Sequence, residues 1–133
     1  MGFTDAAEVR KYLGGVFETA FADPEIGPKL KDTGIILKTV YTAPESIVLI
    51  DTTTGTVSEG TADSEASAEM HMSAELGNAY WQGKVNLPLA MAKSKIKVQG
   101  NVASLLKLAP LGKKLYPRYI ETLKADGRED LLV

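Results

Sequence analysis

Residues 83–101 read GKVNLPLAMAKSKIKVQGN, and this stretch decides how the rest of the chain is interpreted. It opens on a short apolar run, for which Asn86 is a natural helix N-cap and Pro88 suits the first turn. Lysine and apolar residues then alternate, as they do in a strand with one face toward a core. We therefore predict a short helix over 86–92 and a strand over 93–99. In this strand the inward residues are Ile96 and Val98, and the outward residues are Lys95, Lys97 and Gln99.

The first third of the chain predicts one helix followed by a meander of strands. Residues 4–22 have the i, i+3, i+4, i+7 apolar spacing of an amphipathic helix, and Asp23-Pro24 ends it. Gly14-Gly15 within this helix indicates either close contact with a sheet or a weak point that lets the helix lift. Residues 24–34 are rich in turn formers, and we expect at most one helical turn there. Antiparallel strands joined by tight turns are predicted at 35–42, 46–51 and 56–60.

The remaining elements complete an α+β fold. The alternating run ASAEMHMS predicts a strand over 66–73, with a short helix over 74–82 after it. Helical pieces are expected at 102–109 and 117–125, because Pro110 and Pro117 fit poorly in a helix interior. This order predicts an antiparallel sheet covered on one face by helices. The residues expected on the other, solvated face are Lys38, Glu69, His71, Lys95 and Lys97.

Length, charge and composition exclude several classes of protein. The chain has 133 residues, so we expect a single domain over 1–133. With 15 basic and 17 acidic residues it lacks the basic field that nucleic-acid binding needs. Cysteine is absent, which leaves no disulfide and no thiolate ligand. No apolar run approaches the ~20 residues of a membrane span and no signal pattern opens the chain, so we expect a cytoplasmic protein without stable membrane insertion.

The titratable residues form no recognisable catalytic set. His71 is the single histidine, and it lies between two methionines with Glu69 as its nearest same-face carboxylate. A histidine on a surface strand is an ordinary solvated residue more often than a general base. Asp63 and Glu65 are explained by a polar loop, and neither a phosphate-binding glycine loop nor a nucleophile elbow is present. We predict no catalytic residue, no metal site and no cofactor.

Apolar side chains are in excess on the short helices of the second half. Methionines add flexible, polarizable side chains that adapt to irregular shapes. These residues either fill an ordinary core or wall off a cavity between sheet and helices, and periodicity alone leaves both interpretations open. In the second interpretation the ligand-binding residues are Phe17, Phe21, Met70, Met72, Trp81, Leu87, Leu89, Met91, Ile96, Leu105, Leu108, Leu115, Tyr116 and Tyr119.

The motifs of the opening stretch resemble those of a sterol carrier protein 2 domain. The resemblance rests on Gly83-Lys84, Leu89-Ala90, Ile96-Lys97-Val98-Gln99-Gly100 and Leu105-Leu106-Lys107-Leu108. Upstream, the order agrees at Ala22-Asp23-Pro24-Glu25 and at Trp81-Gln82-Gly83-Lys84. The tail through Leu115-Tyr116-Pro117-Arg118-Tyr119 and 127–132 is similar to stand-alone bacterial members. Ser94 and Asn101 depart from the pattern, since glycine and an acidic residue are common at these two positions.

The resemblance implies a five-stranded, mainly antiparallel sheet with helices on one face and an apolar tunnel between them. It also implies binding and transfer of fatty acids, acyl-CoA esters, sterols or phospholipids, without a cofactor and without turnover. The run LPLAMA would then line the cavity or its mouth. An acidic head group would stay at the mouth, because burying an unpaired charge is costly. The lysines expected to meet it are Lys93, Lys107, Lys113 or Lys114.

Two alternatives use other features of the sequence. The first is an enzyme acting on a hydrophobic substrate, with His71 or Asp51 as its base. The second is an interaction module or accessory subunit that presents an apolar surface to a lipid-metabolising enzyme. For the favoured carrier we expect a monomer or weak dimer that contacts a membrane or an enzyme transiently.

Overall fold

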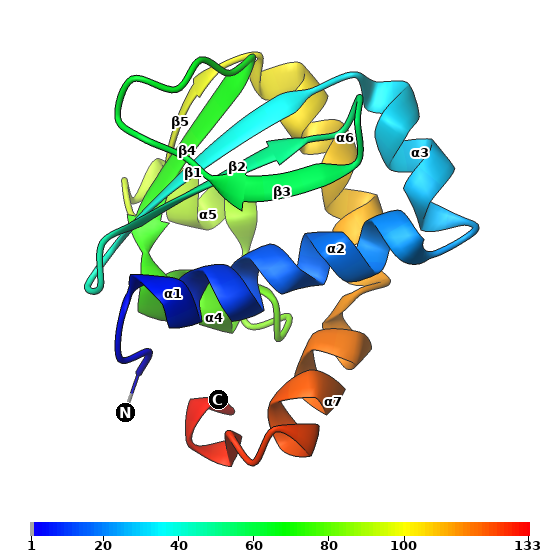
Figure 1. Ribbon diagram of the computed structural model, residues 1–133. Helices are drawn as coiled ribbons and strands as arrows, with labels where there is room; N and C mark the ends of the chain where they lie inside the picture. Colours follow the sequence, from blue (N-terminus) through cyan, green and yellow to red (C-terminus); the bar gives the residue numbers. More distant parts are fainter. Residues whose placement is uncertain (1) are drawn as a thin grey trace.

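The fold is built on a five-stranded sheet, seen in a computed structural model that describes residues 2–133 (Figure 1). The strands are β1 (Ile36–Thr42), β2 (Ser46–Asp51), β3 (Thr56–Glu59), β4 (Ala68–Ser73) and β5 (Lys97–Gly100). Their order is β3-β2-β1-β4-β5, and every pair is antiparallel except β1 with β4, which is parallel. The predicted α+β class with a mainly antiparallel sheet is confirmed.

Alternation along the strands places one row of side chains under the helices. In β1, Leu37, Thr39 and Tyr41 are buried on this face. The parallel register pairs Thr39 with Met70 and Tyr41 with Met72, so β4 extends the same row. The helix-facing side of the sheet is therefore apolar across its centre.

The predicted N-terminal helix is present but is not a uniform α-helix. It comprises α1 (Ala6–Val9), a π-helical turn (Arg10–Gly14) and α2 (Gly15–Ala22), and the Asp5 carboxylate caps it by accepting from the Glu8 N–H. A Cβ on Gly14 would lie 3.1 Å from Val57 Cγ1 and 3.4 Å from Val48 Cγ1. Close contact with the sheet is thus confirmed at Gly14, whereas Gly15 faces open space.

The segment expected to be mostly turns holds a full helix, α3 (Ile26–Thr33), so that prediction was wrong. The Asp23 carboxylate accepts from the Glu25 N–H at 2.8 Å and from the Ile26 N–H at 2.9 Å, which satisfies the free donors of the first turn. Gly34 closes the helix in the left-handed region, with φ of 62°. Local capping therefore outweighs the turn-forming composition.

The two short helices before the last strand match their predictions. They are α4 (Ala74–Tyr80), capped by Ser73, and α5 (Leu87–Ala92), capped by Asn86. The strand predicted from residue 93 begins only at Lys97, because Ser94 at φ 58° takes the chain through a turn. Burial still alternates as expected. Ile96 is buried, Val98 is half-buried, and Lys95, Lys97 and Gln99 are exposed.

The last helices differ from the prediction in where they break. Helix α6 (Val102–Lys113) continues through Pro110, and the break falls at Lys114-Leu115, before α7 (Tyr116–Ala125). A proline leaves the carbonyl four residues earlier without its helical partner. That residue is Leu106, which is exposed, as is Pro110, so the proline lies on the solvent-facing side of α6. A single 3-10 turn (Glu129–Leu131) follows α7.

A buried polar network holds α7 and the end of the chain against α4. The Tyr119 hydroxyl donates to Asn78 Oδ1 at 2.6 Å, and Asn78 Nδ2 donates to the Leu131 carbonyl at 2.7 Å. Gln82 Nε2 donates to Asn78 Oδ1 and to the Leu131 carbonyl. Because these buried groups are paired, the position of α4 is set by directional bonds as well as by packing.

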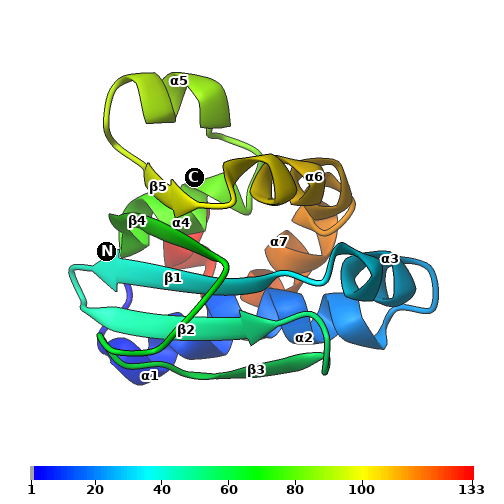
Figure 2. The same cartoon turned by 90° about the horizontal axis from the view of Figure 1, so that it is seen from above.

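The outer face of the sheet is only partly solvated, which corrects one prediction. The connection from β3 to β4 crosses this face over β2 and β1 (Figure 2). Lys38 is only 4% exposed beneath it, where its Nζ donates to the Ala62 carbonyl at 2.7 Å and lies 3.3 Å from Glu69 Oε1. Glu69 and His71 are half-buried, with 2.5 Å between Glu69 Oε2 and His71 Nε2. The hydrogen bond from His71, assisted by Lys38, holds the pKa of Glu69 below its usual value.

We expect Gly77→Ala in α4 to lower the free energy of unfolding. The new methyl carbon would lie 2.8 Å from Tyr41 Cε1 and 3.0 Å from Leu13 Cδ1. Overpacking of this kind costs about 1–3 kcal/mol, more than the gain of up to about 1 kcal/mol from helix propensity. Gly15→Ala is the matched control, since nothing lies within 4 Å of its added methyl and its φ is helical, and it should stabilise. Urea unfolding measures both, and equal effects would contradict this packing.

We expect Glu69→Gln to destabilise by about 1–3 kcal/mol at neutral pH, because it leaves the buried Lys38 ammonium without its anion. The pKa of Glu69 is lowered in the folded protein, so the carboxylate stabilises above its unfolded pKa, and this contribution is lost as pH falls. The gap between wild type and variant should shrink below about pH 4.5, the ordinary carboxyl value. In a Lys38→Met background the same change should cost less. A pH-independent gap in denaturant midpoints would refute the assignment.

Candidate functional site

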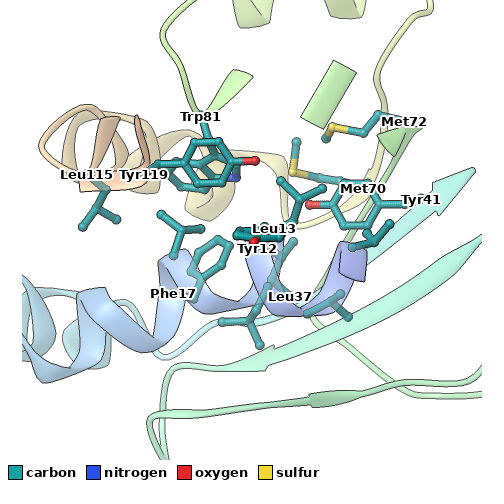
Figure 3. Close-up of a cluster of buried hydrophobic side chains, with 14 of the residues drawn as sticks. Tyr12, Leu13, Phe17, Leu37, Tyr41, Met70, Met72, Trp81, Leu115 and Tyr119 are labelled. Atoms are coloured by element: carbon teal, nitrogen blue, oxygen red, sulfur yellow. The ribbon is translucent and has the colours of Figure 1, made fainter. Parts of the chain in front are cut away.

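An apolar cavity lies between the sheet and the helices, and it is the candidate site. Its volume is about 50 Å³. Its walls come from α2, β1, β4, α4, α5 and α6, and Figure 3 shows Tyr41, Met70 and Met72 facing Phe17 and Trp81 across the cluster. The lining residues are Phe17, Leu37, Thr39, Tyr41, Met70, Met72, Tyr80, Trp81, Leu87, Leu105, Leu108 and Ala109.

The floor of the cavity is the helix-facing row of β1 and β4. The two methionines supply side chains with several accessible rotamers, so this floor can change shape. Four side chains of the lining carry a polar group, namely Thr39, Tyr41, Tyr80 and Trp81. Burial raises the pKa of Tyr41 to about 12, against a smaller lowering by Thr39, so its hydroxyl is neutral at physiological pH. The cavity therefore suits an apolar or neutral group and offers no partner to a charge.

An aromatic cluster forms the wall farthest from the sheet. Trp81 contacts Phe17 edge to face with ring centroids 5.3 Å apart, and Tyr80 in the same way at 5.3 Å. Tyr116, at the start of α7, contacts the rings of Tyr80 and Trp81, with ring centroids 6.1 Å apart in each pair. Helix α6 approaches Trp81 through Gly112, where a Cβ would lie 3.4 Å from the indole. This wall rests on α4, which the Asn78 network holds in place.

An open groove of about 570 Å³ adjoins the cavity and shares Tyr80, Leu87 and Ala109 with it. It runs between the N-terminal end of α5 and one side of α6. Its other lining residues are Gly83, Lys84, Val85, Asn86, Pro88, Leu106, Lys113 and Tyr116. Both lysines are exposed, and within residues 2–133 neither forms an ion pair. The groove beside the apolar cavity is thus positively charged.

Half of the residues predicted to bind ligand line the cavity. They are Phe17, Met70, Met72, Trp81, Leu87, Leu105 and Leu108. Tyr116 lines the groove. Leu89 is 51% exposed, and Met91 is half-buried outside the cavity. The rest belong to other parts of the hydrophobic core, namely Phe21, Ile96, Leu115 and Tyr119.

Five cavity residues were not among those predicted. Leu37, Thr39 and Tyr41 alternate along β1, which indicates that they share one face, but their place beside the methionines follows from the pairing of β1 with β4. Tyr80 is next in the sequence to Trp81, which was predicted to bind ligand, so its position indicated a place in the site. Ala109 had none, because a small residue on α6 becomes part of a cavity wall only through the packing of that helix.

Of the four lysines predicted to meet a head group, Lys113 lines the groove. Lys114 is paired instead with Glu25, with 2.8 Å between Nζ and Oε1. Lys93 and Lys107 are exposed outside the groove. Lys84 was not predicted and occupies the groove beside Gly83.

The residues of the enzymatic alternative do not reach the cavity. His71 projects from the outer face of the sheet, where it contacts Glu69. Asp51 ends β2, and its carboxylate accepts from the Thr53 N–H and hydroxyl in a turn. Residues 2–133 contain no group of three or more His, Cys, Asp or Glu side chains arranged to hold a metal ion.

Among the helices of residues 2–133, none is both long and apolar enough to cross a membrane.

Three solved structures share this fold. The sterol carrier protein domain 2 of Helicoverpa armigera is 23% identical with a TM-score of 0.68, over 82% of this chain and 88% of that one. Sterol carrier protein 2 from Yarrowia lipolytica in its apo form is 17% identical with a TM-score of 0.66, over 86% of this chain and 96% of that one. Sterol carrier protein 2 from Aedes aegypti, in complex with the C16 fatty acid palmitate, is 21% identical with a TM-score of 0.57, over 83% and 96%.

No curated protein sequence matches the chain. The three solved structures are less than 25% identical to this chain, so their similarity shows a shared fold and no more. The model of the SCP-2 sterol transfer family matches residues 16–113, which is more than half of the chain and includes the sheet, the whole cavity lining and α6. The order of strands and the apolar space beneath the helices agree with this match, and we conclude that the chain belongs to the SCP-2 sterol transfer family.

Proposed function

We propose that the protein binds and transfers, without turnover, a hydrophobic ligand that has one long apolar chain, such as a fatty acid. The observation that carries this proposal is an apolar cavity beside a groove that holds two lysines without ion pairs and shares three lining residues with the cavity. Membership of the SCP-2 sterol transfer family supports it, as does the palmitate complex of the Aedes aegypti protein. The apolar chain would enter the cavity, and the acidic head group would stay in the groove near Lys84 and Lys113.

The chemistry of the lining supports an acyl chain with its charge outside. Each buried methylene contributes about 0.8 kcal/mol, so a long chain gains more from the cavity than a short one. A buried carboxylate would need a charged or strongly donating partner, and the lining supplies neutral groups only. Burial also raises the pKa of Tyr41 to about 12, which keeps the phenol protonated near neutral pH and leaves no phenolate to act as a base. These features favour binding over catalysis.

Binding requires the cavity to open, because about 50 Å³ is well below the roughly 300–1,000 Å³ of common ligand sites. Helix α6 is the wall best suited to move. Leu105 and Gly112 are its only buried residues, whereas the shorter α2 buries Val16, Phe17 and Ala20. Rotamer changes of Met70 and Met72 would enlarge the floor at the same time. We propose that the ligand displaces α6 and takes the space between it and the sheet.

A substitution at the junction of cavity and groove tests this path. Ala109→Phe should block it and weaken the binding of a fluorescent fatty acid at least tenfold, because Ala109 lines both spaces. Ala103→Phe is the matched control, since Ala103 is exposed on the same helix, and it should bind as wild type does. Trp81 is the single tryptophan and lines the cavity, so its emission should change on binding in the wild type. Failure of fatty acids, sterols and phospholipids alike to bind would end the proposal.

Hydrogen exchange tests the moving wall separately. In the ligand-free protein, amides of α6 should exchange faster than those of α2, because α6 is anchored by fewer buried side chains. Bound fatty acid should slow exchange in α6 more than in α2. Mass spectrometry of peptides from both helices reports the difference, and equal protection in the free protein would contradict this role of α6.

A further inference from the structure

The charges of this chain are divided unevenly between its parts. From Leu76 to Ile120 the sequence has eight basic residues and no acidic one. The remainder has seven basic and 17 acidic residues, so the total of −2 combines two opposite fields. A charge distribution of this kind orients a protein in an external field even when the total charge is small.

Most of these basic residues have no partner in the protein. Lys114 pairs with Glu25, and Arg118 pairs with Asp23. The other six form no ion pair with any residue of 2–133, and all six are exposed. They are Lys84, Lys93, Lys95, Lys97, Lys107 and Lys113.

The six lysines lie in β5, in α6 and in the connections on either side of α5. These segments lie together along one side of the molecule. Figure 2 shows these elements along the top, with α1 and β3 on the opposite side. Large exposed apolar side chains also occur here. Leu89 on α5 is 51% exposed and Leu106 on α6 is 45% exposed. We call this surface, with its six lysines and two leucines, the α5–α6 face.

We propose that the α5–α6 face docks on the surface of a bilayer that contains anionic phospholipid. Unpaired lysines are attracted to the negative potential of such a surface, and exposed leucines can enter the boundary between head groups and acyl chains. The acidic remainder is repelled, so the protein settles with this face toward the bilayer. A bilayer fits better than an acidic protein, because the lysines are spread over β5, α6 and the connections on either side of α5, with leucines among them, and no single pocket collects all six.

The docked orientation also turns the groove toward the lipid. The groove lies between α5 and α6 and includes Leu106, Lys84 and Lys113. A ligand leaving the bilayer would enter the protein without crossing water. This consequence rests on the proposed function, whereas docking itself depends only on the charges and the leucines.

Flotation with phosphatidylcholine vesicles, with or without phosphatidylserine, tests the docking. The wild type should float only with vesicles that contain phosphatidylserine, and less so as salt shortens the Debye length below about 10 Å. Losing one surface lysine lowers partitioning about fivefold, so Lys95→Glu with Lys107→Glu should lower it by more than about 25-fold. Leu89→Ser should weaken flotation several-fold, and Val133→Ser, which changes an exposed apolar residue elsewhere, should leave it unchanged.

The matched control for charge is Lys31→Glu with Lys124→Glu. Both lysines are exposed and form no ion pair within residues 2–133, but they lie outside the face, in α3 and α7. This pair changes the net charge by the same amount and should float as wild type does. Equal loss in both double variants, or no flotation of the wild type, would overturn the proposal. Fatty-acid displacement in solution should be normal for the Lys95, Lys107 variant, which separates failed docking from failed ligand binding.

Discussion

The parallel pairing of β1 with β4 is the constraint on which the rest of the structure depends. It puts Met70 and Met72 beside Thr39 and Tyr41, and this row becomes the floor of the cavity. It also forces the chain after β3 to cross the outer face of the sheet before it can enter β4. The crossing segment covers Lys38, and the Glu69 carboxylate balances that buried charge. One strand pairing thus determines both faces of the sheet.

The same pairing separates the chain into two chemically different sides. The chain between α4 and α7 forms α5, β5 and α6, which lie along the edge of the sheet beyond β4, and α5 and α6 supply one wall of the cavity (Figure 2). The segment that makes this edge is also the one without acidic residues. The groove beside the apolar cavity therefore lies in the positively charged part of the protein. Under the proposed function, the strand order places the ligand's head group and the basic surface side by side.

Local patterns in the sequence were enough to predict most elements, and they failed where distant contacts decide. Alternation predicted the strands and put Lys38 on the outer face, but the loop that covers it follows from the strand order, which periodicity does not contain. The bond from Asp23 to the start of α3 was a local signal hidden by glycine and proline nearby. Pro110 stays within α6 at a position where both the proline and Leu106, whose carbonyl loses its helical partner, are exposed. The net charge of −2 does not indicate that residues 76–120 contain eight basic residues and no acidic one.

The cavity has one firm wall and one loosely anchored wall, and this asymmetry bears on selectivity. The Asn78, Gln82 and Tyr119 side chains hold α4 with bonds that have fixed directions, and the aromatic cluster is attached to that helix. Within residues 2–133, helix α6 opposite has no comparable side-chain bonds to its neighbours beyond the Lys114 pair at its end. A binding space whose size is set by the ligand discriminates poorly between shapes and lengths. Such a protein would accept a range of related lipids and leave the choice among them to whatever supplies and removes them.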